Sequence, residues 1–326
     1  MRPRDPARFF PLHWRLHHGG SLTPWEERDF VANSIHSDDL YTYLTAEQDR
    51  YWYAFIPYCF GTTWDGALAA PARSVLIPCL HDEPFARFAA TEQVLRAVRG
   101  VCFHVPAERA LGETIAGEPR DTFFLVGEGV DSVTTAGDSA RFRRKYRIDD
   151  PFLLYAGRKV REKNTLLLLD YFARYRLTHP DRPLKLVLVG PGDVRIPDRL
   201  SDDVRDLGVV PAADRQDAYA AALALCQPSL LESFSIVLME AWLAGTPVLV
   251  HGDCAVTREH CLASNGGLFF REYFEFVEAV ELLLADAALR ERLAAKGRAY
   301  VLANFTWERV IANYLDMFHR VGARLA

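Results

Sequence analysis

Two polar stretches in the second half of the chain have residue types and spacing suited to binding an anion. The first contains Gly157, Arg158 and Lys159 and continues to Lys163, between an apolar run and a helical one. Cations at a turn that opens a helix form a natural phosphate clamp, because the positive end of the helix dipole adds to their charge. The competing interpretation is a solvated basic loop, and this stretch alone does not exclude it.

The second stretch begins at Glu232 and carries another glutamate, Glu240, eight positions later. This spacing is common by chance, so its context decides its meaning. Glu232 follows an apolar run, and Glu240 lies just over one turn into a helix that we expect to begin near Ser235. Both carboxylates can therefore face a ligand at the carboxyl edge of a parallel sheet. Free backbone N–H groups of residues 235–237 would donate to a pyrophosphate there.

These stretches need strands and helices to position them, and the second half of the chain alternates the two. Runs of Val and Leu lack the period-2 pattern of half-exposed strands, which indicates strands buried on both faces of a parallel sheet. We predict a doubly wound, Rossmann-like domain. Its expected strands are 152–156, 184–190, 207–210, 224–227 and 247–251, and its expected helices are 165–177, 214–223 and 236–244.

The first half predicts a smaller α/β unit. Strands are expected at 51–57, 74–80, 100–105 and 122–127, with a helix at 84–98. The first fifty residues carry a helical stretch at 23–32 and are otherwise expected to be irregular, with no strand followed by a glycine-rich turn. We therefore expect an abbreviated domain with an unpaired or unusually covered sheet edge. The apolar segment 9–16 and a second copy of the chain are the candidate covers.

The polar segment 129–151 reads as a connector between the two units. We place the first domain at 1–137, the second at 138–305 and a final helix at 306–326. Thr306 is the expected N-cap of this helix. The helix should cross back to the first domain, because its apolar residues would otherwise be exposed. These residues are Trp307, Val310, Ile311, Tyr314, Leu315 and Phe318.

Taken together, these motifs resemble the retaining GT-B glycosyltransferases of family 4, also called glycosyl transferases group 1. The resemblance rests on the two stretches above and on Gly190-Pro191-Gly192 between them. It extends from residue 74 to the end of the chain, because Leu80-His81-Asp82-Glu83-Pro84 and the segment 126–131 also match family motifs. It implies an α/β fold of two Rossmann-like domains facing a cleft, with a nucleotide-sugar bound mainly by the C-terminal one.

The resemblance also implies roles for individual residues. Arg158 and Lys163 would hold the diphosphate, Glu232 would contact the transferred sugar, and Glu240 would accept hydrogen bonds from the ribose. Fixed cations suit a leaving group whose negative charge grows, and a carboxylate can receive two neighbouring hydroxyls. The implied catalytic residues are His81, Arg158, Lys163 and Glu232. The implied donor site consists of Gly157, Arg158, Lys163, Gly190, Gly192, Glu232, Ser233, Phe234, Ser235, Ile236, Val237 and Glu240.

The chain departs from the family pattern at three places. Asn164 and Ser235 replace common glycines, and both residue types tolerate turns. The missing glycine-rich turn of the first domain normally lies beside the acceptor. One alternative is therefore a catalytically weak or silent nucleotide-sugar binder that needs a partner or lost N-terminal residues. Another is a different enzyme on the same fold, such as an epimerase or a phosphorylase.

Composition excludes several other classes. The 326 residues carry a net charge of −5, and half of them are apolar, which excludes a disordered chain. Basic residues are dispersed, so no nucleic-acid partner is expected. No apolar run approaches the ~20 residues of a membrane span, and we expect a cytoplasmic protein. Six cysteines without a C-x-x-C pair indicate reduced thiols. No two aspartates lie two positions apart, and such D-x-D pairs commonly bind a metal ion that bridges the diphosphate, so we expect no metal. We also expect no cofactor, since the nucleotide-sugar is a substrate.

The sequence therefore predicts an enzyme that transfers a hexose from a UDP- or GDP-sugar with retention at the anomeric carbon. Front-face substitution is the expected mechanism, since no motif carboxylate is obviously placed as a nucleophile. The expected partners are the nucleotide-sugar and a glycan, lipid-linked or small-molecule acceptor. A homodimer and peripheral membrane contact are left open.

Overall fold

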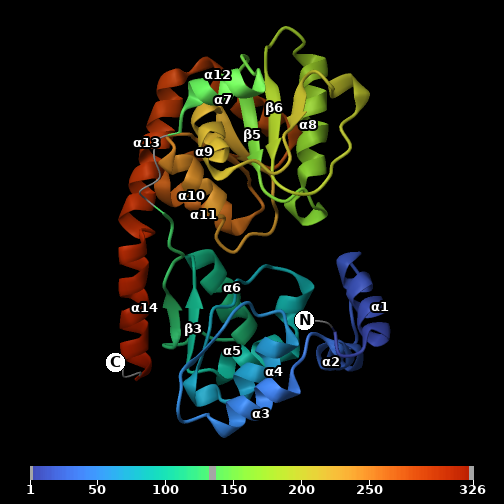
Figure 1. Cartoon of the computed structure of the whole chain (residues 1–326), viewed down its shortest axis with the longest axis vertical. Helices are drawn as coiled ribbons and strands as arrows, with labels where there is room; N and C mark the ends of the chain where they lie inside the picture. Colours follow the sequence, from blue (N-terminus) through green and yellow to red (C-terminus); the bar gives the residue numbers. More distant parts are fainter. Residues whose placement is uncertain (1–2, 132–136, 323–326) are drawn as a thin grey trace. The chain divides into compact units, whose positions relative to one another are not determined.

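The computed structural model describes residues 3–131 and 137–322, which divide into two compact units (Figure 1). One unit runs to Gly127 and resumes at Ile311, and the other is Glu128–Val310. The second unit begins before the boundary that we predicted at residue 138. The reason is a hydrogen bond of 2.9 Å from the Val130 N–H to the Phe305 carbonyl, which ties the predicted connector to that unit. Residues 132–136 of the connector lie outside the described ranges.

The larger unit is built on a six-stranded, fully parallel sheet. Its strand order is β10-β9-β8-β5-β6-β7, which places β5 near the middle. β5, β6, β8 and β9 are buried along most of their length, as their continuous apolar runs require. The bounds are β5 Phe152–Ala156, β6 Lys185–Val189, β7 Val204–Asp206, β8 Ala224–Gln227, β9 Val248–His251 and β10 Gly267–Phe270.

Helices cover both faces of this sheet. Right-handed crossovers send helices to opposite faces when the chain reverses direction across the sheet. One face packs against α8 (Thr165–Thr178) and α12 (Tyr273–Ala285). The other carries α9 (Ala212–Ala221), on which α7 (Ser139–Tyr146) packs. It also carries α10 (Ile236–Leu243) and α11 (Ala255–Ser264), both packed against α13 (Ala287–Asn304). This is the doubly wound arrangement that the sequence predicts.

Two edge strands differ from the prediction. β7 lies at Val204–Asp206, whereas we expected a strand at 207–210, and β10 was not expected at all. Edge strands face solvent, so their apolar signal is short: Arg205 and Asp206 of β7 are exposed. The sequence pattern therefore identifies the central strands better than the edges.

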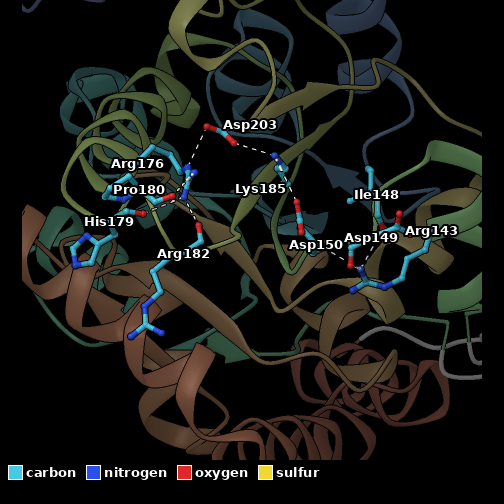
Figure 2. A network of polar contacts seen from close by, with 10 residues as sticks. All are labelled: Arg143, Ile148, Asp149, Asp150, Arg176, His179, Pro180, Arg182, Lys185 and Asp203. Atoms are coloured by element: carbon cyan, nitrogen blue, oxygen red, sulfur yellow. Dashed lines mark hydrogen bonds and ion pairs between the residues drawn. The ribbon is translucent and has the colours of Figure 1, made fainter.

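A polar network fixes the amino ends of three strands, at the edge opposite to the carboxyl ends (Figure 2). The Lys185 ammonium at the start of β6 lies 3.6 Å from Asp150 Oδ2, just before β5, and 3.0 Å from Asp203 Oδ1, just before β7. Asp203 Oδ2 also accepts from Arg176 Nε at 3.1 Å. Arg143 donates to the carbonyls of the turn that leads into β5. These contacts hold the strands in register without using their carboxyl ends.

The smaller unit contains a four-stranded parallel sheet in the order β1-β2-β3-β4. Its strands are β1 Tyr53–Phe55, β2 Ser74–Leu76, β3 Gly100–Phe103 and β4 Phe123–Leu125. Helices α4 (Gly61–Ala69), α5 (Ala89–Ala97) and α6 (Pro106–Ala116) connect them. Alternate residues point to opposite faces: Leu76 and Phe103 join the core under these helices, whereas Val75 and Cys102 face α14 (Trp307–Val321).

Helix α14 buries only part of the apolar face that we predicted. Tyr314 and Phe318 pack on the sheet together with Met317 and Val321. Three residues of the predicted face are instead exposed: Trp307, Ile311 and Leu315 at 53%, 52% and 45%. The predicted face spans two adjacent rows of the helix, and one sheet face contacts one row. The Thr306 hydroxyl accepts from the Arg309 N–H at 3.4 Å, which confirms Thr306 as the N-cap.

The opening of the chain is more regular than predicted. It forms α1 (Pro6–His17), α2 (Pro24–Asn33) and α3 (Asp38–Ala46). Asp5 caps α1, since its Oδ1 accepts from the Ala7 N–H at 3.0 Å, and Pro6 begins the helix. Within the described ranges β1 pairs only with β2, so the expected free edge is present. The segment 9–16, a candidate cover of that edge, is part of α1, which packs against α2 and places Leu16 in the core beneath the helices.

Candidate functional site

The carboxyl edge of the larger sheet contains a topological switch point. From β5 the chain moves to β6 on one side, and it later returns to β8 on the other. The loops that follow β5 and β8 therefore leave the sheet in opposite directions, and it is in the crevice at such a point that open α/β sheets bind ligands. The first polar stretch singled out in the sequence lies in the loop after β5, and the second begins in the loop after β8 and continues into α10.

Glycines bring the loops after β5 and β6 into backbone contact. Gly157 and Gly190 have φ angles of 155° and 131°. A Cβ atom on Gly190 would lie 2.0 Å from the Gly157 carbonyl oxygen, so no other residue fits. Gly192, with φ of 97°, approaches the Lys159 backbone in the same way. These three predicted residues shape the rim of the crevice.

Of the two neighbouring cations on the β5 loop, only Arg158 is free for a ligand. The Lys159 side chain is fully buried and donates to the Gly190 carbonyl at 2.6 Å and to Asp206 Oδ1 at 2.8 Å. It holds the loops together and is therefore not available to a phosphate, which agrees with the assignment of the clamp to Arg158 and Lys163 rather than to Lys159. Arg158 is exposed, and its guanidinium has no partner among the residues the structure describes. Its carbonyl accepts from the Tyr155 hydroxyl at 2.6 Å, which fixes the backbone at this point.

The crevice is bridged by an ion pair between two predicted site residues. Lys163 Nζ lies 2.7 Å from Glu232 Oε1. The same oxygen accepts from Gln227 Nε2 at 3.0 Å. A further hydrogen bond of 3.2 Å, from the Asn164 amide to the Pro228 carbonyl, ties the two loops together. The cation assigned to the diphosphate and the carboxylate assigned to the sugar are therefore direct neighbours.

Two helices begin at this crevice with residues in the left-handed conformation. Asn164 precedes α8 with φ of 56°, and Ser235 precedes α10 with φ of 73°. These are the positions where the resembled family commonly has glycine, and the positive φ values explain that preference. The first N–H groups of α10, including those of Ile236 and Val237, have no acceptor within their own helix. They provide the positive end of a helix dipole next to the loop that follows β8.

Unsatisfied polar atoms gather in the loop after β8. Gln227 Oε1, Ser229 Oγ and Ser235 Oγ are buried and lack a hydrogen-bond partner in the described structure. Buried polar atoms without partners are rare in folded proteins, and each calls for an explanation. A polar ligand bound in the crevice would supply hydrogen-bond partners for these atoms and would explain why they are unsatisfied. Phe234, between these residues, is buried, and its carbonyl accepts from His260 Nε2 at 3.0 Å.

Glu240 is held by two side chains that the sequence did not identify. Arg215 Nη2 donates to its Oε1 at 2.9 Å, and the Tyr219 hydroxyl donates to its Oε2 at 2.7 Å. Burial, followed by the Glu240 charge, raises the pKa of Tyr219 well above its usual value, so the phenol stays a donor. Arg215 and Tyr219 lie four positions apart on α9, a spacing that places two side chains on one helix face. This four-residue spacing was the signal in the sequence by which Arg215 and Tyr219 could have been identified as a pair.

His81 lies in the smaller unit, after the carboxyl end of β2. The Leu80 N–H donates to Glu108 Oε1 at 2.7 Å, and the His104 N–H donates to Glu108 Oε2 at 2.6 Å. The fully buried Glu108 carboxylate thus joins the loops after β2 and β3 and fixes the backbone next to His81. His81 Nδ1 lies 3.4 Å from Glu83 Oε1.

Comparison with known proteins identifies the family. Residues 138–300 match the family model of glycosyl transferases group 1. The chain belongs to this family. The matched region contains every predicted donor residue from Gly157 to Glu240, whereas His81 lies outside it. The group 1 match thus covers the unit that carries the crevice.

Curated relatives of this protein are also named glycosyltransferases. D-inositol 3-phosphate glycosyltransferase of Xylanimonas cellulosilytica is 29% identical over 278 residues, which are 79% of this chain and 65% of the relative. The enzyme of the same name from Kribbella flavida is 30% identical over 264 residues, 75% of this chain and 62% of the relative. The chain thus spans less than two thirds of the length of these relatives.

Solved structures show the fold of this group 1 member. Sucrose-phosphate synthase from Thermosynechococcus elongatus matches with a TM-score of 0.69 at 19% identity, over 91% of this chain and 78% of that one. HepE of Anabaena, solved in complex with UDP-glucose, matches with a TM-score of 0.68 at 16% identity, over 86% and 81%. At these identities the likeness establishes the GT-B fold with two Rossmann-like domains.

Two other features are absent from residues 3–131 and 137–322. No three His, Cys, Asp or Glu side chains there are grouped so that they could hold a metal ion. No helix in the same ranges has the length and apolar character needed to cross a bilayer. The six cysteines are free thiols, and burial raises the pKa of Cys226 and Cys261.

Proposed function

We propose that this protein transfers a hexose from a nucleoside diphosphate sugar to an acceptor hydroxyl, with the donor bound in the crevice of the larger unit. The observation that carries the proposal is the Lys163–Glu232 pair at the switch point, beside the unsatisfied atoms of Gln227, Ser229 and Ser235. Family membership and the names of the curated relatives support it. UDP is the first nucleotide to test, because a structural neighbour was solved with UDP-glucose.

The diphosphate would bind between the β5 loop and the start of α10. Arg158 offers an exposed guanidinium, which can bind two phosphate oxygens at once. The N–H groups of Ile236 and Val237 add donors and the helix dipole. Lys163 would contact the phosphate nearest the sugar while it keeps its bond to Glu232. These groups stabilise the charge that develops on the leaving diphosphate.

The sugar and the ribose would be recognised by different carboxylates. Glu232 has one oxygen engaged by Lys163 and Gln227, which leaves the other oxygen for sugar hydroxyls. Glu240 is oriented by Arg215 and Tyr219, and each carboxylate oxygen has a second lone pair for a ribose hydroxyl. The division of roles predicted from the motif is thus compatible with the hydrogen bonds.

Retention at the anomeric carbon, without a metal, is the finer part of the proposal. Glu232 is paired with an ammonium and an amide, which lowers its nucleophilicity. We therefore favour front-face substitution. In this reaction the bond from the anomeric carbon to the diphosphate breaks, the bond to the acceptor oxygen forms on the same face, and the acceptor proton passes to a donor phosphate oxygen.

Calorimetric titration of UDP and GDP, followed by a transfer assay with their sugars, tests the proposal. We expect one nucleotide to bind, and its affinity to fall in Arg158→Ala. If a nucleotide binds but no sugar is transferred to any acceptor, the alternative of a silent nucleotide-sugar binder is favoured. Absence of binding by both nucleotides would contradict the proposal.

His81 is proposed as a catalytic residue, and its test differs in kind. His81→Ala should lower the turnover of the transfer reaction while the affinity for the free nucleotide stays unchanged. His104→Ala is not a suitable control, because His104 Nδ1 is paired with buried Glu108. His18→Ala is suitable, since this histidine is exposed, its ring stacks on Trp14, and its Nδ1 lies 2.7 Å from the Trp14 carbonyl oxygen, so both contacts are local to the end of α1. Equal turnover in wild type and His81→Ala would remove the assignment.

A further inference from the structure

The smaller unit contains a cavity of about 430 Å³ at the carboxyl ends of β1 and β2. Helices α1 and α2 form one wall, and the loops after β1 and β2 form the other. Its size lies within the range of small-molecule sites. Five phenylalanines line it: Phe9, Phe10, Phe30, Phe60 and Phe85. The cavity is therefore apolar, and it depends on the two helices that open this chain.

A small set of polar groups converges on the same cavity. Glu83 lines it, and its Oε1 accepts from the Tyr58 hydroxyl at 2.6 Å and lies 3.4 Å from His81 Nδ1. Burial alone would raise the pKa of Glu83, but the hydrogen bonds from His81 and Tyr58 outweigh it and lower the pKa, so the carboxylate is ionised. A fixed carboxylate can accept a hydrogen bond from a ligand hydroxyl. The cavity thus has a polar end next to His81.

The charge of the lining disfavours anionic ligands. No Lys or Arg is among its described lining residues, and Glu83 is the only residue there with a permanent charge. Burial and then the neighbouring His17 lower the pKa of His13, so that His13 is neutral at pH 7. A phosphate in this cavity would meet a carboxylate without a compensating cation, which is unfavourable in apolar surroundings.

We propose that this cavity binds the acceptor of the transfer reaction, and that the acceptor is an uncharged hydroxyl compound carrying an aromatic or alkyl group. The proposal rests on the proposed function, because it assigns the second substrate of the same reaction. The aromatic lining contacts the apolar group, and Glu83 receives a hydroxyl at the end near His81. The acceptor therefore differs in chemistry from the phosphorylated inositol that appears in the names of the curated relatives.

Phenyl β-D-glucopyranoside and myo-inositol 1-phosphate serve as contrasting probes. The first is a neutral aryl glycoside, and the second is a phosphorylated polyol. Each is titrated into the full chain by calorimetry, with UDP titrated in parallel. Phe10→Ala and Phe60→Ala remove cavity rings that are partly exposed, so folding should survive. Trp14→Ala is the control, because Trp14 is an exposed aromatic on the same helix α1 that does not line the cavity.

We expect saturable binding of the phenyl glucoside, weakened about fivefold or more in each cavity variant and unchanged in Trp14→Ala. The inositol phosphate should not bind. Binding of the inositol phosphate alone, or equal phenyl glucoside affinity in wild type and both cavity variants, would overturn the proposal. If UDP binds but the phenyl glucoside does not, the cavity assignment fails and the proposed function stands. If the phenyl glucoside binds but neither UDP nor GDP does, the proposed function fails and the cavity loses its acceptor role.

Discussion

Lys163 and Glu232 come from loops on opposite sides of a switch point, and their side chains meet at 2.7 Å. The cation that should face a phosphate and the carboxylate that should face a sugar are thereby linked. The bond orients both groups before a ligand arrives, which is the preorganisation that transition-state stabilisation requires. It also means that substitution of one residue affects the other.

Lys163→Ala should weaken nucleotide binding by roughly ten- to a hundredfold, since a charge-assisted hydrogen bond contributes about 1.5–3 kcal/mol. Calorimetry with UDP measures this loss. Arg161→Ala is the matched control, because Arg161 is an exposed cation two positions earlier on the same loop. Equal losses in the two variants would show that general positive charge, and not the position of Lys163, binds the phosphates.

The two glutamates should differ in which ligand they recognise. Glu240→Gln should weaken the binding of UDP itself, because it loses the carboxylate proposed to hold the ribose. Glu232→Gln should leave UDP affinity nearly unchanged and weaken the UDP-sugar. Tyr219→Phe keeps the Glu240 charge and removes one orienting hydroxyl, so its effect on UDP should be smaller than that of Glu240→Gln. Calorimetric titration of UDP and UDP-glucose into the three variants measures these affinities. Equal losses of affinity for both ligands in all three variants would contradict this division of roles between the glutamates.

Lys159 should matter for stability and not for ligand binding. Lys159→Met leaves the Gly190 carbonyl and the partly exposed Asp206 carboxylate without their buried donor, at a cost of about 1–3 kcal/mol. Arg158→Ala, one position earlier, should leave the melting temperature nearly unchanged. Thermal unfolding followed by circular dichroism compares the two. A more stable Arg158→Ala than Lys159→Met is the expected order, and the reverse would refute the structural role of Lys159.

The strand-end network should give the larger unit a dependence on acid. Burial would raise the pKa of Asp203, but hydrogen bonds from Lys185 and Arg176 outweigh it and lower the pKa. A lowered folded pKa stabilises the protein above the ordinary carboxyl pKa of about 4, and this stabilisation is lost as pH falls through the folded value. Asp203→Asn should therefore be less stable than wild type at pH 7, with a difference that shrinks toward pH 3. Urea unfolding at both pH values measures it, and a constant difference would contradict the assignment.

The sequence predicts what local patterns encode. Central strands such as β5 and β8 have continuous apolar runs, and their predicted bounds match the structure. The structural role of the buried Lys159 side chain was not predictable from the sequence, because its partner Asp206 comes from an edge strand far along the chain. Arg215 and Tyr219 were missed for a similar reason: their spacing on α9 acquires meaning only when α10 brings Glu240 beside them.

In the N-terminal helices the local sequence pattern predicted less regular structure than the chain forms. Pro6 and Pro11 favour an irregular opening, yet Pro6 begins α1 and Pro11 lies within it. Proline is compatible with a first helical turn, and the packing of Phe9 and Leu16 stabilises the helix beyond it. Tertiary contacts of this kind leave no local signal. They also create the aromatic cavity, which no sequence motif indicated.

A crystal structure of the full chain grown with UDP-glucose tests the central claim most directly. The account predicts that the diphosphate contacts the Arg158 guanidinium and the N–H groups of Ile236 and Val237, with the ribose hydroxyls on Glu240 and the glucose hydroxyls on Glu232. Nucleotide bound at another place in the chain, or a crevice without nucleotide at a saturating concentration, would contradict it.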